Sequence, residues 1–332
     1  MKQQDFEARF TTRWEQLTAW LESAPGPARK AAATGLDAAE VPARYREVCQ
    51  HLALAQDRQY SAELIERLSR LALAGHQRLY GAQGALLAPL GRFVLSGFPQ
   101  AVRAQLRYVL LALLLFFGPL LLLTGALQRY PEFAYVVLPA EYVDGFEEMY
   151  GEESQALGRK RDADDDAVMF GFYVWNNVSI GFRTFASGLL AGVGSVVVLV
   201  MNGVIIGGVA GHLTAIGYGG PFWRFVATHS APELLAIVIA GGAGLQIGMA
   251  LLAPGRRTRG RALVEAGRDG ARLVLGVFAM LVFAAFVEAY WSSRAALPDA
   301  LRFTVAGVLW VGILAWLAFG GRNAPARDDE GT

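Results

Sequence analysis

Several polar side chains stand beside or inside strongly apolar stretches, where they could bind an ion or a polar solute. His229 and Glu233 lie at the start of one such stretch, and Glu288 shortly precedes the aromatic pair Tyr290-Trp291. Ionisable and amide side chains inside a membrane need partners and are functional candidates by default. The candidates for a polar membrane site are Asn177, Arg183, Asn202, His212, His229, Glu233 and Glu288.

A structural interpretation competes with this one for His229 and Glu233. In Ser230-Ala231-Pro232-Glu233 the serine can cap a helix, and the glutamate can reach back to its amide. A carboxylate in that first turn also opposes the positive end of the helix dipole. This pattern predicts a helix that begins at Ser230 and gives Glu233 a structural task, whereas capping does not require the imidazole of His229.

Two further candidates are open to more than one interpretation. Asn202 either bonds to another helix or caps a helix break together with Gly203. Glu288 either snorkels to water near the membrane boundary or faces Arg183 or His229 inside the bundle.

Enzyme signatures are absent from the sequence. It contains no phosphate-binding loop ending in Lys-Ser/Thr, no His-Glu-x-x-His and no Gly-x-Ser-x-Gly. Cys49 is the single cysteine, so a disulfide framework or a cysteine zinc cluster cannot form, and only four histidines are present. We therefore expect no catalytic residue, no metal site, no cofactor and no enzymatic activity.

The composition indicates what kind of elements must position these side chains. Of 332 residues, 54% belong to the hydrophobic set and only 18% are charged, with a mean hydropathy of +0.34. These values are typical of a polytopic helical membrane protein, so we predict an all-α fold. Apolar stretches suited to membrane segments lie at 108–127, 184–211, 232–253, 273–287 and 303–321.

The part before the first apolar stretch resembles a soluble helical domain followed by a surface helix. Apolar residues from Phe6 to Leu21 recur at helical spacing, so residues 1–80 are predicted to form a small cytoplasmic all-α domain, and no cleavable signal peptide is expected. Residues 81–107 are apolar but interrupted. They predict an interfacial amphipathic helix whose arginines, Arg103 among them, face lipid phosphates.

The remaining chain is predicted to be the membrane domain, residues 108–321, with an acidic extracytoplasmic loop at 128–183 and a disordered tail at 322–332. Basic residues place 254–272 on the cytoplasmic side, yet only two apolar stretches separate that region from the loop. Either the basic-side rule fails, or one glycine-rich stretch is broken or re-entrant, with Asn202-Gly203 and Pro221 as candidate interruptions.

Glycines recur at four-residue spacing in the apolar stretches. Such stripes let helix backbones approach closely in lipid, and they predict packing within the chain, contact between copies or the lining of a pathway. The predicted helix-packing positions are Gly188, Gly192, Gly203, Gly207, Gly211, Gly244 and Gly248.

The order of these motifs resembles the stage II sporulation protein M family of bacterial membrane proteins, over roughly residues 95–320. The resemblance rests on Asn-Asn before a glycine-rich helix, on Asn202-Gly203, on the His229 to Leu234 start, and on Glu288 before the aromatic pair. The chain departs from the family's usual Pro-His-Gly at that start, where it has Thr228-His229-Ser230.

The resemblance implies a multi-pass protein of the bacterial inner membrane. Its sporulating members look like scaffolds for a peptidoglycan-remodelling machine, and relatives with an enlarged N-terminal domain have no assigned role. We therefore expect a scaffold that contacts lipid, forms homo-oligomers and recruits cytoplasmic or membrane proteins, with no nucleic-acid partner. The alternative is a transporter or channel with a polar site around His229, Glu233, Asn202 and Glu288.

Overall fold

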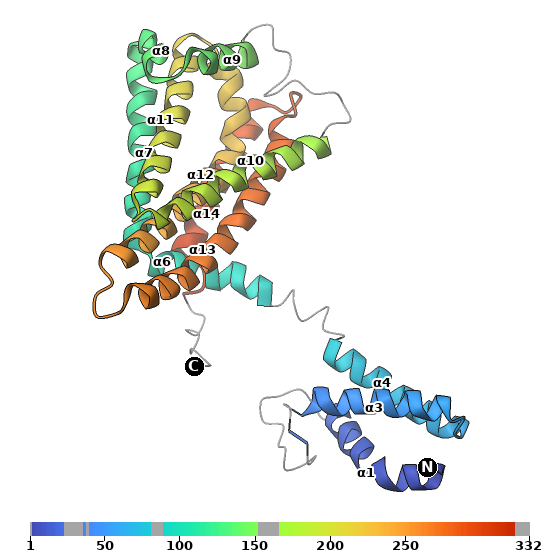
Figure 1. Ribbon diagram of the computed structural model, residues 1–332. Helices are drawn as coiled ribbons and strands as arrows, with labels where there is room; N and C mark the ends of the chain where they lie inside the picture. Colours follow the sequence, from blue (N-terminus) through green and yellow to red (C-terminus); the bar gives the residue numbers. More distant parts are fainter. Residues whose placement is uncertain (1, 23–35, 38–39, 81–88, 152–165, 323–332) are drawn as a thin grey trace. The chain divides into compact units, whose positions relative to one another are not determined.

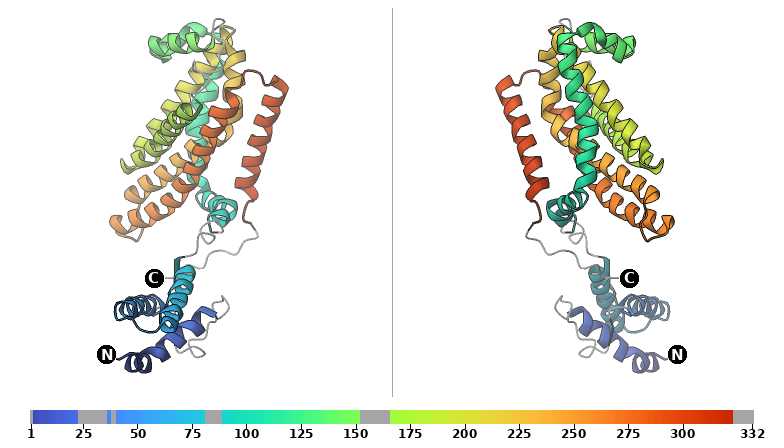
Figure 2. Two further views of the ribbon diagram at one scale, coloured as in Figure 1. Left: turned by 90° about the vertical axis from the view of Figure 1, so that its right-hand side faces the viewer. Right: turned by 90° about the vertical axis from the view of Figure 1, so that its left-hand side faces the viewer.

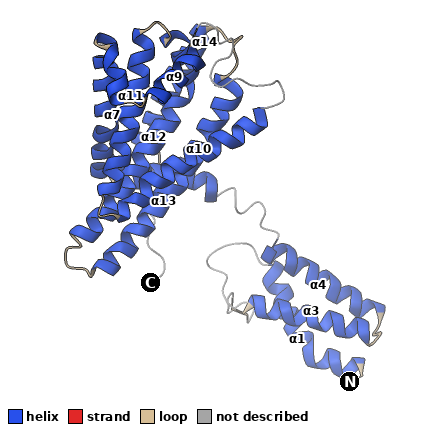
Figure 3. Cartoon of the chain, turned by 45° about the horizontal axis from the view of Figure 1, so that its top comes forward, coloured by secondary structure: helices blue, strands red, loops and turns tan. Residues whose placement is uncertain are grey.

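A computed structural model describes residues 2–22, 36–37, 40–80, 89–151 and 166–322 (Figure 1). Every regular element in these ranges is a helix, as Figure 3 shows, so the all-α prediction is confirmed. The chain divides into two compact units, Met1–Gly91 and Arg92–Thr332. Most of the predicted tail, from residue 323 on, lies outside the described residues.

The N-terminal unit has a hydrophobic core of its own. The apolar stripe of its first helix is buried, including Phe6, Trp14 and Leu17. Trp14 Nε1 donates a hydrogen bond to Nδ1 of the buried His51 at 3.1 Å, and burial lowers the pKa of His51. The helices of this unit are α1 (Gln3–Glu22), α3 (Val41–Asp57) and α4 (Ala62–Tyr80).

The second unit opens with a short helical segment, formed by η1 (Phe93–Gly97) and α6 (Phe98–Ala104). Arg103 of α6 donates to the carbonyl oxygens of Leu317 at 2.8 Å and Gly320 at 2.7 Å, at the C-terminal end of the last helix. The prediction that Arg103 faces lipid phosphates is therefore wrong. Its guanidinium instead satisfies carbonyls that a helix end leaves without partners.

Five helices of the second unit are long and apolar enough to cross a membrane, which confirms a multi-pass membrane protein. The most buried of them is α12, which packs against the other four and forms the core of the unit (Figure 2). The candidate spans are α7 (Leu106–Arg129), α11 (Val193–Ala215), α12 (Gly219–Leu252), α13 with η4 (Arg259–Ser292) and α14 (Asp299–Phe319).

The region predicted as an acidic loop is largely helical where the structure describes it. After η2 (Pro131–Phe133), α8 (Ala134–Val137) and α9 (Ala140–Tyr150), the helix α10 (Asp166–Ala186) packs against α12 and α13. At the start of α10, Asp166 Oδ2 lies 3.7 Å from Arg294 Nη2. Near the end of α10, the carbonyl of Thr184 accepts a hydrogen bond from Ser195 Oγ. In Figure 1, α10 lies obliquely across the bundle.

Helix α10 and the break that follows it bear on the conflict over topology. The stretch 184–211 is not one helix, because η3 (Ser187–Leu189) and Gly192, with φ of +82°, separate α10 from α11. The break therefore lies at 187–192, whereas Asn202-Gly203 and Pro221 both lie inside continuous helices. The basic loop at 254–258 and Arg107 line the same cavity, so they lie at the same end of the bundle.

The glycines predicted for packing contact backbone within the same chain. Gly203, Gly207 and Gly211 of α11 lie against carbonyl oxygens of α7. Gly188 lies against Gly244, and Gly192 against Gly248, where the turn before α11 meets α12. A side chain at most of these positions would overlap the neighbouring backbone, so these stripes serve contacts inside the chain.

Candidate polar site within the membrane domain

The helix that carries His229 and Glu233 begins ten residues before His229, at Gly219, and ends at Leu252. The predicted helix start at Ser230 is therefore wrong. Ser230 is buried inside the helix, where its hydroxyl donates to the carbonyl of Ala227 at 2.8 Å and accepts from Trp310 Nε1 at 3.1 Å. A serine hydroxyl satisfied in this way need not cap.

Pro232 is one of the irregularities of this helix. It lies inside α12 and has no amide hydrogen, so it cannot donate the usual helical bond to the carbonyl of Thr228. The interruption therefore falls on the turn that contains His229.

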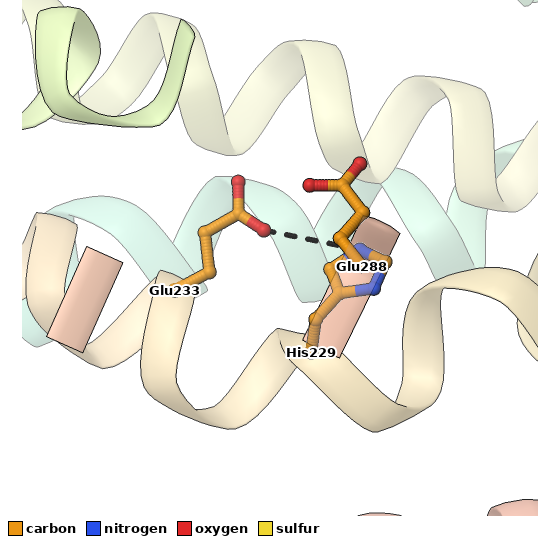
Figure 4. Close-up of side chains that lie close together, drawn as sticks. All are labelled: His229, Glu233 and Glu288. Atoms are coloured by element: carbon orange, nitrogen blue, oxygen red, sulfur yellow. Dashed lines mark ion pairs between the residues drawn. The ribbon is translucent and has the colours of Figure 1, made fainter. Parts of the chain in front are cut away.

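His229 and Glu233 project from α12 one turn apart (Figure 4). His229 Nε2 and Glu233 Oε2 are 3.8 Å apart, with side-chain exposures of 5% and 17%. Both side chains are thus withdrawn from solvent within an apolar helix. At 1.5 Å per residue, His229 lies about 15 Å along the axis from the start of α12.

Glu288 completes this cluster from a different part of the chain. It is the first residue of η4 (Glu288–Ser292), a π-helical turn at the end of α13, and it is buried. One ligand atom from each of His229, Glu233 and Glu288 lies within 4.8 Å of the others. Because its side chain is buried, Glu288 does not snorkel to water, and of the two alternatives it is the one facing His229 inside the bundle that the structure shows.

Hydroxyl groups orient the imidazole. Ser292, at the other end of η4, has its Oγ 3.0 Å from His229 Nδ1 and 2.6 Å from Thr228 Oγ1. In the tautomer in which Nδ1 carries the hydrogen and donates to Ser292, Nε2 presents its lone pair toward Glu233. The π-helical turn supplies both Glu288 and Ser292 to α12, in keeping with the frequent occurrence of π-bulges at functional sites.

The side-chain amide of Asn177, in α10, supports the carboxylate of Glu288. Asn177 is buried, and its Nδ2 donates to Glu288 Oε2 at 3.5 Å. Asn176 in turn donates from Nδ2 to Asn177 Oδ1 at 3.0 Å. The Asn-Asn pair therefore reaches the cluster from a third helix.

Aromatic rings lie beside the cluster. The ring of Phe225 lies edge-on to His229, with centroids 5.2 Å apart. Tyr150, at the end of α9, lies near Glu288: burial raises the pKa of this tyrosine, and the negative charge of Glu288 raises it further. Aromatic side chains thus flank the cluster beside His229 and near Glu288.

Comparison with known proteins identifies the second unit. The sequence profile of the stage II sporulation protein M family matches residues 108–293, more than half of the chain. The chain belongs to the stage II sporulation protein M family. A second profile, described as a domain of unknown function (DUF8413), matches residues 4–81, which correspond to the N-terminal unit. No curated protein and no solved structure matches the chain.

The part matched by the stage II sporulation protein M profile begins in α7 and ends directly after η4. It therefore contains every residue of the cluster, together with the hydroxyl groups and amides that orient it. Helix α14, which packs against α12, lies outside the matched part.

Three predicted site residues, Asn202, Arg183 and His212, lie apart from this cluster. Asn202 donates to the carbonyl of Val198 in its own helix at 2.8 Å, so it neither bonds across to another helix nor caps a break. Arg183 is exposed and donates to the carbonyl of Ser179 at 3.2 Å. Both satisfy their donors locally.

His212 forms a different pair, at the end of the bundle where α9 lies. Its Nε2 is 2.6 Å from Glu147 Oε1, and its ring lies edge-on to that of Tyr135. The hydroxyl of Tyr135 donates to Asp144 and Glu147 at 3.3 Å. Burial raises the pKa of Tyr135, and the negative charges of Glu147 and Asp144 raise it further. This group connects α8 and α9 to α11 and does not include the other candidates.

Thr228 and Ser292 are the contributors that sequence reasoning missed. Each stands beside a predicted candidate: Thr228 precedes His229, and Ser292 follows Glu288 by four residues. A small polar residue one turn from a membrane-embedded glutamate was the available signal for Ser292, since both would face the same neighbour in a helix.

The cluster has the chemistry of a cation site. It combines an imidazole nitrogen with two carboxylates, which are ligands for a metal ion and acceptors for a proton. Burying carboxylates away from water is costly unless a positive charge or hydrogen-bond donors compensate. His229, Glu233 and Glu288 are therefore the residues that could hold an ion.

Proposed function

We propose that this member of the stage II sporulation protein M family transports a small cation across the membrane, with His229, Glu233 and Glu288 as its binding site. The supporting observation is the convergence of their ligand atoms to within 4.8 Å in the interior of the membrane domain. Packing alone does not require such a group, because apolar side chains of similar volume would fill the space without the cost of desolvating charge.

The helices that carry the site are irregular where they meet it. Pro232 interrupts the hydrogen bonding of α12 one turn after His229, and the π-helical turn η4 carries Glu288. Interrupted helices around an ion site are common in transporters, because the freed backbone groups and local flexibility serve binding and release. The position of both irregularities therefore supports transport.

The proposed location is the bacterial inner membrane, with the basic end of the bundle toward the cytoplasm. Arg256, Arg257 and Arg259 follow α12 at the end where Arg103 and Arg107 also lie. Lys and Arg are enriched in cytoplasmic loops, so this end is the cytoplasmic one under the positive-inside rule. The N-terminal unit is then cytoplasmic as well.

A flux measurement tests the proposal. In proteoliposomes of the full-length protein, we expect uptake of protons, monovalent cations or divalent cations above that of protein-free vesicles. Glu288→Gln preserves the shape of the side chain and its bond from Asn177 but removes the charge, so flux should fall to background. Arg183→Gln is the matched control: this exposed side chain lies apart from the cluster, and flux should persist. No flux of any of these cations, or equal flux in wild type and Glu288→Gln, would refute the proposal.

A membrane scaffold is the second candidate function, and the N-terminal unit favours it. This unit has its own hydrophobic core and its own profile match, as a separate partner-binding domain would. Oligomers formed through the glycine stripes receive no support from the contacts observed, because those faces are occupied within the chain. Any homo-oligomer would need another surface.

Deletion of residues 2–80 separates the two candidates. If the unit recruits partners, the truncated protein should lose the proteins that cross-link to the full-length chain, while the membrane domain still carries flux. Mass spectrometry of cross-linked membranes, together with the flux assay, measures both effects. An unchanged set of cross-linked proteins would remove the scaffold proposal.

A further inference from the structure

The geometry points to a divalent transition-metal ion of the zinc class, bound by Nε2 of His229 and one carboxylate oxygen each of Glu233 and Glu288. This inference rests on the proposed function, because it names the cation of the same site. It goes beyond that function in fixing the ligand atoms and the chemical class of the ion.

The positions of the ligand atoms are close to those that a metal requires. His229 Nε2 and Glu233 Oε2 are 3.8 Å apart, and all three ligand atoms lie within 4.8 Å of one another. Zinc binds nitrogen and oxygen at about 2.0–2.2 Å, so tetrahedral ligands lie roughly 3.4 Å apart. A bound ion would require the two glutamate side chains to rotate so that their oxygens close this difference.

Neighbouring groups already hold these ligands as the second layer of a metal site would. Histidine ligands usually donate their other ring hydrogen to an oxygen, which fixes the tautomer and the ring orientation. Here Ser292 Oγ lies 3.0 Å from His229 Nδ1, and Thr228 Oγ1 lies 2.6 Å from Ser292. Asn177 supports Glu288 in the same manner at 3.5 Å.

The ligand set favours a transition metal over the other common cations. Magnesium and calcium prefer sites composed of oxygen, whereas imidazole suits zinc and its neighbours in the first transition row. A divalent ion also balances the charges of Glu233 and Glu288 beside a neutral imidazole, which a monovalent ion does not. Charge balance matters here because the site lies inside an apolar bundle.

Three protein ligands leave a fourth position for water or another donor. Structural zinc sites are closed by four protein ligands, whereas sites with three keep an exchangeable position. An exchangeable position is what a transported ion needs, because it must both enter and leave. The ligand count of this cluster is therefore consistent with an ion that is not permanently bound.

Cobalt and zinc binding to the full-length protein in detergent test this inference. Co²⁺ should give the intense visible absorption of a tetrahedral nitrogen-oxygen site, saturating at one ion per chain and displaced by Zn²⁺. His229→Gln and Glu233→Gln should abolish the absorption. Ser292→Ala changes only a positioning residue and should weaken affinity by about 10- to 100-fold while the spectrum of the bound ion stays tetrahedral.

His212→Gln is the matched control, because His212 and Glu147 form another histidine-glutamate pair 2.6 Å apart. It should bind Co²⁺ as the wild type does, and loss of the absorption in this variant alone would overturn the assignment. A wild-type protein that binds neither metal but conducts another cation would overturn the inference and leave the proposed transport standing. Tight metal binding without any flux would uphold the metal site and refute transport.

Discussion

Replacing Gly244 by alanine is expected to prevent the membrane domain from packing. A Cβ at this position would overlap Ser195 Oγ and would lie 2.9 Å from the carbonyl oxygens of both Thr184 and Phe185. These atoms cannot move apart easily, because Ser195 Oγ donates to the Thr184 carbonyl at 2.6 Å in a fully buried contact. The one added methyl group would separate the ends of α10 and α12 from the start of α11.

Overpacking of a rigid core costs about 1–3 kcal/mol and occasionally more. Two backbone carbonyls of α10 and the bonded hydroxyl of Ser195 crowd this position, which places Gly244 at the upper end. We expect a strongly lowered melting temperature and aggregated protein by size-exclusion chromatography in detergent. Gly312→Ala in α14 is the matched control: nothing lies within 4 Å of its Cβ position, and alanine favours a helix over glycine by up to ~1 kcal/mol. Equal melting of Gly244→Ala and Gly312→Ala would contradict this packing.

Replacing Arg302 by methionine should have the second largest effect. Arg302 is fully buried at the start of α14, and its guanidinium donates to carbonyl oxygens of α12, of the end of η4 and of the segment that follows η4. Nη1 reaches Ser292 at 3.0 Å and Arg224 at 3.4 Å, Nε reaches Leu297 at 3.2 Å, and Nη2 bonds to Arg294. Methionine fills a similar volume but leaves the buried carbonyl of Ser292 and three partly buried carbonyls without this donor.

Hydrogen bonds from charged donors are worth about 1.5–3 kcal/mol each, so the loss should lower stability by ~3 kcal/mol or more. Because Arg302 holds the backbone of Ser292, and Ser292 orients His229, cobalt affinity should fall together with the melting temperature. Arg224→Met is the control: its ion pair with Asp299 is half exposed, and such pairs contribute about 0–1 kcal/mol. Equal melting temperatures for the two variants would refute this role of Arg302.

The membrane spans could be predicted because hydropathy is a local property of sequence. Helix α10 could not, since Asn176, Asn177 and Arg183 lower its mean hydropathy below that of its neighbours. Its polar residues have partners only in the folded bundle, where Asn177 meets Glu288 from η4. Tertiary contacts, which local hydropathy does not report, thus hold this segment as a helix against α12 and α13.

The sequence could predict which residues are candidates for the site, but not which way their side chains point. His229, Glu233, Glu288 and Asn177 converge, whereas Asn202 bonds within its own helix. Depth in the membrane can be read from neighbouring residues, but the face of a helix that meets another helix depends on long-range packing. The prediction of a helix start at Ser230 failed for the same reason. Residues that precede the Ser-Ala-Pro-Glu motif determine where α12 begins.

X-ray absorption at the zinc edge, on the full-length protein in lipid nanodiscs, tests the central claim most directly. We predict one ion per chain, with one imidazole nitrogen and two carboxylate oxygens at about 2.0–2.2 Å, and loss of that signature in Glu288→Gln. Zinc surrounded by water oxygens alone, or an unchanged spectrum in Glu288→Gln, would contradict a metal site formed by His229, Glu233 and Glu288.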